Sequence, residues 1–233
     1  MIEHRPFATL GSANHGWLDA HHHFSFAAYH DPARVNWGAL RVWNDDTIAA
    51  GTGFPTHPHA DMEIVTYVRK GAITHTDNMG NEGRTEAGDV QVMSAGTGIA
   101  HSEYNREDED TQIFQIWIIP DERGGEPAWG ARPFPKEGRN GQFVPLASNA
   151  ANDDGALPIR ADASVLGATV KAGKSVTYRP ASASRHLYLV PATGRIAIGN
   201  VEAVARDGIA ITGEKDITIT ALEDAELILV DAA

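Results

Sequence analysis

The sequence contains no cysteine among its 233 residues. Scaffolds held together by disulfides, and zinc or iron–sulfur sites with cysteine ligands, are therefore excluded. Basic residues are also few: 19 lysines and arginines stand against 31 acidic residues, which gives a net charge of −12 with neutral histidines. Because clustered cations are needed to neutralise phosphates, this balance argues against direct binding of nucleic acid.

Long apolar runs are missing too. The first residues include no apolar stretch of signal-peptide length, and no later run is long enough to span a bilayer. We therefore expect no membrane association and a cytoplasmic location. At roughly 100–200 residues per domain, the chain is long enough for one large domain or two small ones.

Long amphipathic helices are scarce, and short strand-like runs take their place. Examples are residues 63–68, 113–118, 216–220 and 226–230, which are rich in β-branched residues and lie between clusters of turn-forming residues. This spacing predicts an all-β fold, a sandwich or barrel, because a parallel α/β fold needs helical segments of roughly ten or more residues between its strands.

The chain divides into two halves of similar plan. Proline and glycine are frequent from residue 120 to 145, and strands do not continue through such composition, so we place a domain boundary near residue 134. Two pairs of segments also resemble each other between the halves, each pair reading as a strand, a turn and the next strand. These pairs are residues 68–73 with 190–196 and residues 88–92 with 207–211.

Candidate metal ligands lie in the first half, where ten of the eleven histidines and all five tryptophans occur. Side chains alternate along a strand, so His57 and His59 share one face, as do His101 and Glu103. Two neighbouring strands that each offer two inward ligands can hold one ion. Imidazole and carboxylate suit Fe(II), Mn, Ni, Cu or Zn, and donor type alone does not choose among these metals.

These residues resemble the two cupin motifs. Gly51, His57, His59 and Glu63 match the first motif, although its closing glycine arrives one residue late, at Gly71. The second motif is matched by residues 88–105, with Ser94 where proline is typical. More narrowly, the chain resembles the pirin family, densely from about residue 14 to 130, and most clearly in three segments: residues 40–46, 56–68 and 93–103.

The resemblance implies two cupin domains, that is, jelly-roll β-barrels in a bicupin arrangement. Residues 1–134 would form the metal-binding domain and residues 135–233 a cupin-like domain without metal ligands. Alignment of the halves without gaps supports this division, because no imidazole or carboxylate falls at the ligand positions of the second half. The residues aligned there are Pro180, Ser182, Thr220 and Leu222.

The carboxylate ligand is a choice between two residues. Glu63 has the same parity as His57 and His59, so an unbroken strand would turn it inward as well, and alternation leaves both acids open. In pirins the ligand set matches His57, His59, His101 and Glu103. Glu63 is then a supporting group or an ordinary strand residue.

The resemblance is strongest to bacterial pirins with quercetin 2,3-dioxygenase activity. It implies one divalent transition metal, with Fe(II) favoured over Mn, Ni, Cu and Zn, and a flavonol-like substrate that reacts with O2. Glu103 would take the proton of the flavonol 3-hydroxyl, and the central ring would open with release of carbon monoxide. Phe54 and Met93 are our expected apolar contacts for the substrate.

Two other functions remain open at this point. One is a metal-bound or redox-sensing regulatory protein that acts through a protein partner without turnover. The other is a different cupin reaction, such as isomerisation of a sugar or small acid, which a pocket lined by Arg and Lys would favour. We expect residues 21–23, three consecutive histidines, to lie in a packed strand or pocket rim, and the tryptophans to pack in the core.

Overall fold

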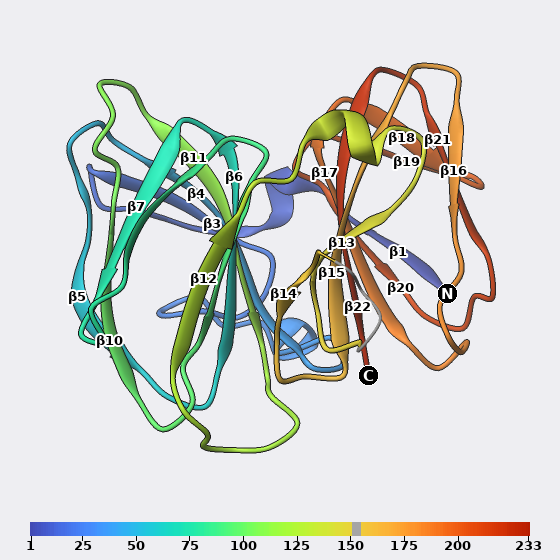
Figure 1. Ribbon diagram of the computed structural model, residues 1–233. Coiled ribbons are helices and arrows are strands. Elements are labelled where there is room, and N and C mark those ends of the chain that lie inside the picture. The colour runs from blue at the N-terminus through green and yellow to red at the C-terminus, as the bar shows by residue number, and fades with distance from the viewer. Residues whose placement is uncertain (151–154) are drawn as a thin grey trace.

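The structure, a computed structural model, describes residues 1–150 and 155–233 and is built almost entirely of β-strands. The predicted all-β fold of two cupin barrels is confirmed, and the barrels lie side by side (Figure 1). The described helices are single 3-10 turns: η1 (Phe7–Thr9), η2 (Pro32–Arg34) and η3 (Lys136–Arg139).

The first barrel closes a seven-stranded sheet over a four-stranded one. The larger sheet has the order β12-β9-β6-β11-β4-β3-β2 and the smaller one β5-β10-β7-β8. Their strands are β2 (Gly11–Asn14), β3 (Leu18–His22), β4 (Leu40–Ile48), β5 (Gly53–His59), β6 (Glu63–Lys70), β7 (Ala72–Asp77), β8 (Glu82–Glu86), β9 (Val90–Ser94), β10 (Ile99–Tyr104), β11 (Thr111–Ile118) and β12 (Ala128–Arg132).

The second barrel repeats this topology. Its sheets have the orders β1-β20-β17-β22-β15-β13-β14 and β16-β21-β18-β19, so β20-β17-β22-β15 corresponds to β9-β6-β11-β4. Its strands are β1 (Ile2–Arg5), β13 (Val144–Ser148), β14 (Leu157–Pro158), β15 (Ala163–Val170), β16 (Ser175–Tyr178), β17 (His186–Thr193), β18 (Arg195–Ile198), β19 (Val201–Val204), β20 (Gly208–Ile211), β21 (Ile217–Ala221) and β22 (Ala225–Ala232).

The amino-terminal strand belongs to the second barrel. β1 pairs with β20 in antiparallel register, and in Figure 1 this blue strand lies among the orange strands of the other half. A single cut of the chain therefore does not separate the two barrels. We propose a boundary near residue 134, between β12 and β13, for the rest of the chain.

The two large sheets share one hydrophobic core. Their outer faces pack together, and a single cluster of buried side chains includes Trp43, Tyr67 and Phe114 from the first barrel and Tyr188 and Val230 from the second. Polar contacts cross the same interface: the Tyr188 hydroxyl lies 2.9 Å from Nδ1 of His23. The first barrel thus packs against the second through its seven-stranded sheet, on the side opposite to β5 and β10.

Strand register corrects our alignment of the two halves. Three residues after the turn glycine, Thr74 of β7 pairs with Tyr104 of β10 in the first barrel. At the same place in the second barrel, Ala197 of β18 pairs with Thr220 of β21. Tyr104 and Thr220 are therefore equivalent positions.

Because Thr220 corresponds to Tyr104, Ile219 corresponds to Glu103 and Ile217 to His101. Both isoleucines are buried in the core of the second barrel and offer no ligand atom. The ungapped alignment placed Thr220 at the position of His101, which is wrong by three residues. The segment from Gly194 to β21 is shorter than the segment from Gly71 to β10. An alignment without gaps therefore misplaces the residues of β21.

The neighbouring strand is also displaced from the ungapped alignment, by two residues. Tyr178 of β16 pairs with β21 opposite the isoleucine that corresponds to His101. Tyr178 therefore takes the place of His57, whereas Pro180 and Ser182 lie beyond the end of this strand.

Within residues 1–150 and 155–233, no helix is both long enough and apolar enough to cross a membrane.

Candidate metal centre

Two paired strands bring three histidines together in the first barrel. β5 carries His57 and His59 on one face, and β10 places His101 directly opposite His57. One ligand nitrogen from each ring lies within 4.8 Å of the other two, and the ring centroids are 4.5 to 5.0 Å apart. These are the three histidines that alternation along the strands predicted to converge.

The nitrogens of two rings are arranged to bind an ion. His57 donates its Nδ1–H to the carbonyl oxygen of Pro55 at 2.7 Å, which leaves a lone pair on Nε2. His101 is buried, and its Nε2 has no hydrogen-bond partner within the described ranges 1–150 and 155–233. A buried nitrogen without a partner is unfavourable, and a bound metal ion would remove that cost.

Burial keeps His59 and His101 neutral. Loss of solvent, together with the charges of the neighbouring histidines, lowers the pKa of His101 to about 3. The same two causes, burial and the charge of His57, lower the pKa of His59 to about 4. Since only a neutral imidazole has a lone pair for a metal, both rings are ready for coordination at neutral pH.

Glu103 lies on the same face of β10 as His101, but outside the group of three histidines. Its Oε1 accepts hydrogen bonds from Thr66 Oγ1 at 3.1 Å and Gln91 Nε2 at 2.6 Å, and its Oε2 accepts one from Gln115 Nε2 at 2.8 Å. Burial raises the pKa of Glu103 to about 7, although the three hydrogen bonds oppose this rise. A carboxylate oxygen has two acceptor sites, so Oε2 keeps one free.

The three donors to Glu103 form a polar row across the barrel. Gln91, Thr66 and Gln115 are direct neighbours on β9, β6 and β11, and their side chains lie between two separate apolar clusters. The interior of the second barrel instead holds one continuous apolar cluster. The sequence did not lead us to these three residues, although a polar side chain at the inward position of three otherwise apolar strands was the signal.

Glu63 does not face the histidines. The chain leaves the small sheet after β5, turns at Asp61 with φ of 51°, and enters the large sheet at β6. Parity therefore does not carry over from His59 to Glu63, because the strand is broken between them. Glu63 accepts a hydrogen bond from Ser94 Oγ at 2.6 Å, and burial raises the pKa of its carboxyl group.

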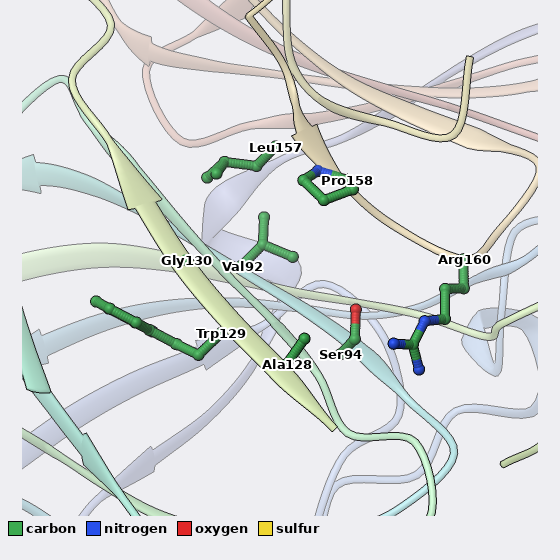
Figure 2. A pocket seen from close by; sticks show the side chains of 8 residues that line it. All are labelled: Val92, Ser94, Ala128, Trp129, Gly130, Leu157, Pro158 and Arg160. Carbon is green, nitrogen blue, oxygen red and sulfur yellow. The ribbon is translucent and has the colours of Figure 1, made fainter. Parts of the chain in front are cut away.

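Ser94 connects Glu63 to the interface between the barrels. A cavity of about 210 Å³ lies there, with Val92 and Ser94 of β9 on one side and Leu157 and Pro158 on the other (Figure 2). The Arg160 side chain lies at its edge (Figure 2). Glu63 therefore belongs to the surroundings of this interface rather than to the histidine cluster.

Aromatic side chains surround the histidines. Trp117 packs edge-on against His59, with ring centroids 5.0 Å apart, and the Phe54 ring lies 6.3 Å from that of His57. Met93 is buried inside the barrel, and Trp117 packs against its apolar cluster. We expected Trp117 to pack in the core, and its contact with His59 was not predicted.

The histidine triplet packs as expected. His21 and His22 lie at the end of β3, and Nδ1 of His22 is 2.8 Å from Oδ1 of Asn44. His23 is fully buried against the second barrel.

Comparison with protein families gives two matches that together span most of the chain. Residues 3–118 match the family described as Pirin, and residues 146–232 match the family described as quercetinase C-terminal cupin domain.

Similar proteins cover the chain from end to end. A pirin-like protein of Caulobacter vibrioides is 65% identical over 233 residues, which is 100% of both chains. Quercetin 2,3-dioxygenase of Escherichia coli K12 is 44% identical and covers 99% of this chain and 98% of its own. The crystal structure of the bacterial pirin YhhW of Escherichia coli in complex with nickel(II) has a TM-score of 0.93 at 42% identity, covering 100% of this chain and 99% of that one. The chain therefore belongs to the pirin family.

Proposed function

We propose that this pirin is a metal-dependent dioxygenase that opens the central ring of flavonols such as quercetin with O2 and releases carbon monoxide. The observation that carries the proposal is the cluster of three histidines with an unpartnered, buried Nε2 on His101. A relative 44% identical over nearly its whole length is named quercetin 2,3-dioxygenase.

His57, His59 and His101 would hold one divalent transition metal, and we propose Glu103 as the fourth ligand, through the free acceptor site on Oε2. Three imidazoles and a carboxylate suit Fe(II), our preferred ion, as well as Mn, Ni, Cu and Zn. A related pirin has been crystallised with nickel(II). When bound, the metal would supply Lewis acidity and an open position for substrate and O2.

Glu103 is our candidate for the catalytic base. In the metal-free protein burial raises its pKa to about 7, so a carboxylate that is not bound to the ion would both accept and release a proton near neutral pH, the range in which general bases work best. Hydrogen bonds from Thr66, Gln91 and Gln115 leave the carboxylate one acceptor site, on Oε2. That site would hold either the metal or a proton, so Glu103 would have to leave the ion in order to act as the base. The proton it would receive is that of the flavonol 3-hydroxyl.

The surroundings of the histidines suit an aromatic substrate better than a sugar. A hollow of about 470 Å³ reaches His59 and is lined mainly by apolar groups, including Pro58 and Ile99. Among the residues that the structure describes, no Arg or Lys lines it. Trp117 and Phe54 add flat apolar surface beside the ligands. This lining favours flavonol chemistry over isomerisation of a sugar or small acid.

The test is quercetin turnover by protein loaded anaerobically with Fe(II) and then exposed to O2. Loss of flavonol absorbance and release of carbon monoxide are followed together. We expect His57→Ala to abolish turnover through loss of the metal, and Glu103→Gln to lower kcat by about 10²–10⁴-fold, as expected for loss of a general base. His15→Ala, an exposed histidine outside the site, is the matched control and should retain full activity.

Two results would overturn the proposal. Full activity in both His57→Ala and Glu103→Gln would separate turnover from these residues. A bound metal with no turnover on any flavonol would instead favour a regulatory protein that acts through a partner.

A further inference from the structure

We propose that Asp77 and His75 are positioning residues that fix the proton of the His101 imidazole on Nδ1, so that Nε2 remains free to bind the metal. This inference rests on the proposed metal centre. It assigns a role to two buried side chains that do not touch the proposed ligand nitrogens.

The three residues form a chain of contacts on adjacent strands. In the register of β7 and β10, Asp77 lies opposite His101, and His75 lies opposite Glu103. Nε2 of His75 is 2.9 Å from Oδ2 of Asp77, and Nδ1 of His75 is 3.4 Å from Nδ1 of His101. The chain therefore ends at the ring nitrogen of His101 that faces away from its free Nε2.

Asp77 can only accept in this chain. Its Oδ1 accepts the backbone N–H groups of Met79 at 2.9 Å and Asn81 at 3.0 Å. Its Oδ2 accepts from Asn81 Nδ2 at 2.9 Å as well as from His75. An ionised carboxylate has no proton to give, so His75 must carry its proton on Nε2.

The remaining assignments follow from that first one. His75 with its proton on Nε2 has only a lone pair on Nδ1. The Nδ1 of His101 faces that lone pair and must donate, which leaves the lone pair of His101 on Nε2. Ligand histidines commonly depend on such a partner to set their tautomer, and its loss typically costs 10–100-fold in metal affinity.

His75 is held in place from the side. Its ring stacks on Trp129 with centroids 4.7 Å apart and planes 10° from parallel. Its side chain is almost fully buried, as is that of Asp77. A ring stacked and buried in this way cannot turn to exchange the roles of its two nitrogens without leaving Trp129.

Asp77→Asn is the most informative variant, because the backbone decides which way the new amide points. Two backbone N–H groups face the Oδ1 position, so the amide oxygen must lie there. The NH2 group must then face His75 and the Asn81 side-chain amide, which would turn to present its oxygen. His75 would then accept at Nε2 and donate from Nδ1. His101 would have to accept at Nδ1, which puts its proton on Nε2 and blocks the ligand position.

The first measurement uses metal-free protein labelled with 15N-histidine. Two-bond 1H–15N correlation spectra distinguish the two neutral tautomers of His101. We expect Nδ1–H in the wild type and Nε2–H in Asp77→Asn. A wild type with Nε2–H, or an Asp77→Asn variant with an unchanged tautomer, would overturn the inference.

The second measurement is Ni(II) affinity by competition with a chelator. We expect Asp77→Asn to raise the Kd by about 10–100-fold. His75→Phe keeps a ring on Trp129 but removes the acceptor, and should also weaken binding. His75→Asn returns an acceptor oxygen to the Nδ1 position and should recover most of the affinity. Equal losses in His75→Phe and His75→Asn would indicate a merely structural role.

Asp89→Asn is the matched control, because Asp89 accepts a backbone N–H from Phe134 at 2.8 Å and lies away from the histidines. Its tautomer pattern and Kd should equal those of the wild type. The two readouts also separate the hypotheses. If wild-type protein bound no Ni(II), the metal centre would fail, while the spectra of the metal-free protein would still decide the role of Asp77.

Discussion

At the residue scale, the candidate centre is set by polar side chains inside an otherwise apolar barrel. The period of two along a strand was enough to predict that His57 and His59 share one face and that His101 and Glu103 share another, whereas the choice of Glu103 over Glu63 rested on the resemblance to pirins. The contacts of His75 and Asp77 could not be predicted in the same way. They depend on how β7 pairs with β10, and a strand's own sequence does not state its register.

Glu63 marks the limit of the same rule. Its parity with His59 holds only for one continuous strand, and the turn at Asp61 moves the chain from one sheet to the other between them. Asp61 has a left-handed backbone conformation, but an aspartate alone in a sequence does not predict that conformation, so the break in the strand could not be predicted.

Glu103 also predicts a pH dependence of stability in the metal-free protein. Its pKa is about 7 in the folded state against an ordinary value of 4.5, so between these values the folded state holds a proton that the unfolded state releases. Stability from this residue is therefore present at low pH and is lost as pH rises through that window, by up to about 3 kcal/mol. Chemical denaturation of metal-free protein from pH 4 to 8 measures it.

Glu103→Gln should remove this loss, so the variant should gain stability over the wild type as pH rises. Buried histidines such as His101 have the opposite sign, because their lowered pKa makes stability rise with pH up to about 6.5. They are present in both proteins and cancel in the difference. A difference between variant and wild type that stays constant across the range would show that Glu103 does not hold a proton in the folded barrel.

At the element scale, the two barrels repeat the same strands and the same turns. The weak repeat in the sequence was real, since the strand orders of the two halves correspond. The ungapped alignment nevertheless misplaced β21 by three residues. The two halves share similar strands and turn glycines, so the topology could be predicted. The lengths of their loops differ, so the register of the strands could not.

The turn glycines give a prediction that follows from this repeat. Gly71 and Gly194 connect equivalent strands with φ of 74° and 78°, a region that side chains rarely adopt. An added Cβ would also meet Thr111 at Gly71 and the Asp224 carbonyl at Gly194. Gly71→Ala and Gly194→Ala should each lower the free energy of unfolding by about 1–3 kcal/mol, measured by chemical denaturation.

Gly138→Ala is the control for these two variants. Gly138 has open space around its Cα and no positive φ, so the free energy of unfolding should change by less than about 0.5 kcal/mol. If Gly71→Ala were as stable as Gly138→Ala, the tight turn would not matter to the first barrel.

At the scale of the whole molecule, the two barrels have the same topology but different interiors. The first contains the polar row and the histidines, and the second has isoleucines at the corresponding places of β21. A shared core joins them, and β1 crosses from the beginning of the chain into the second barrel. Composition predicted two β domains. The pairing of β1 with β20 in the other barrel could only be seen in the structure, because the sequence of a four-residue terminal strand does not indicate which strand it pairs with.

The central claim is that one metal ion lies among His57, His59, His101 and Glu103. Crystals of Fe(II)-loaded protein, with anomalous diffraction collected at the iron edge, test it most directly. Our account predicts one anomalous peak per chain, at about 2 Å from a nitrogen of each histidine and from a Glu103 oxygen, and none in the second barrel. A peak at any other place, or none beside the three histidines, would contradict it.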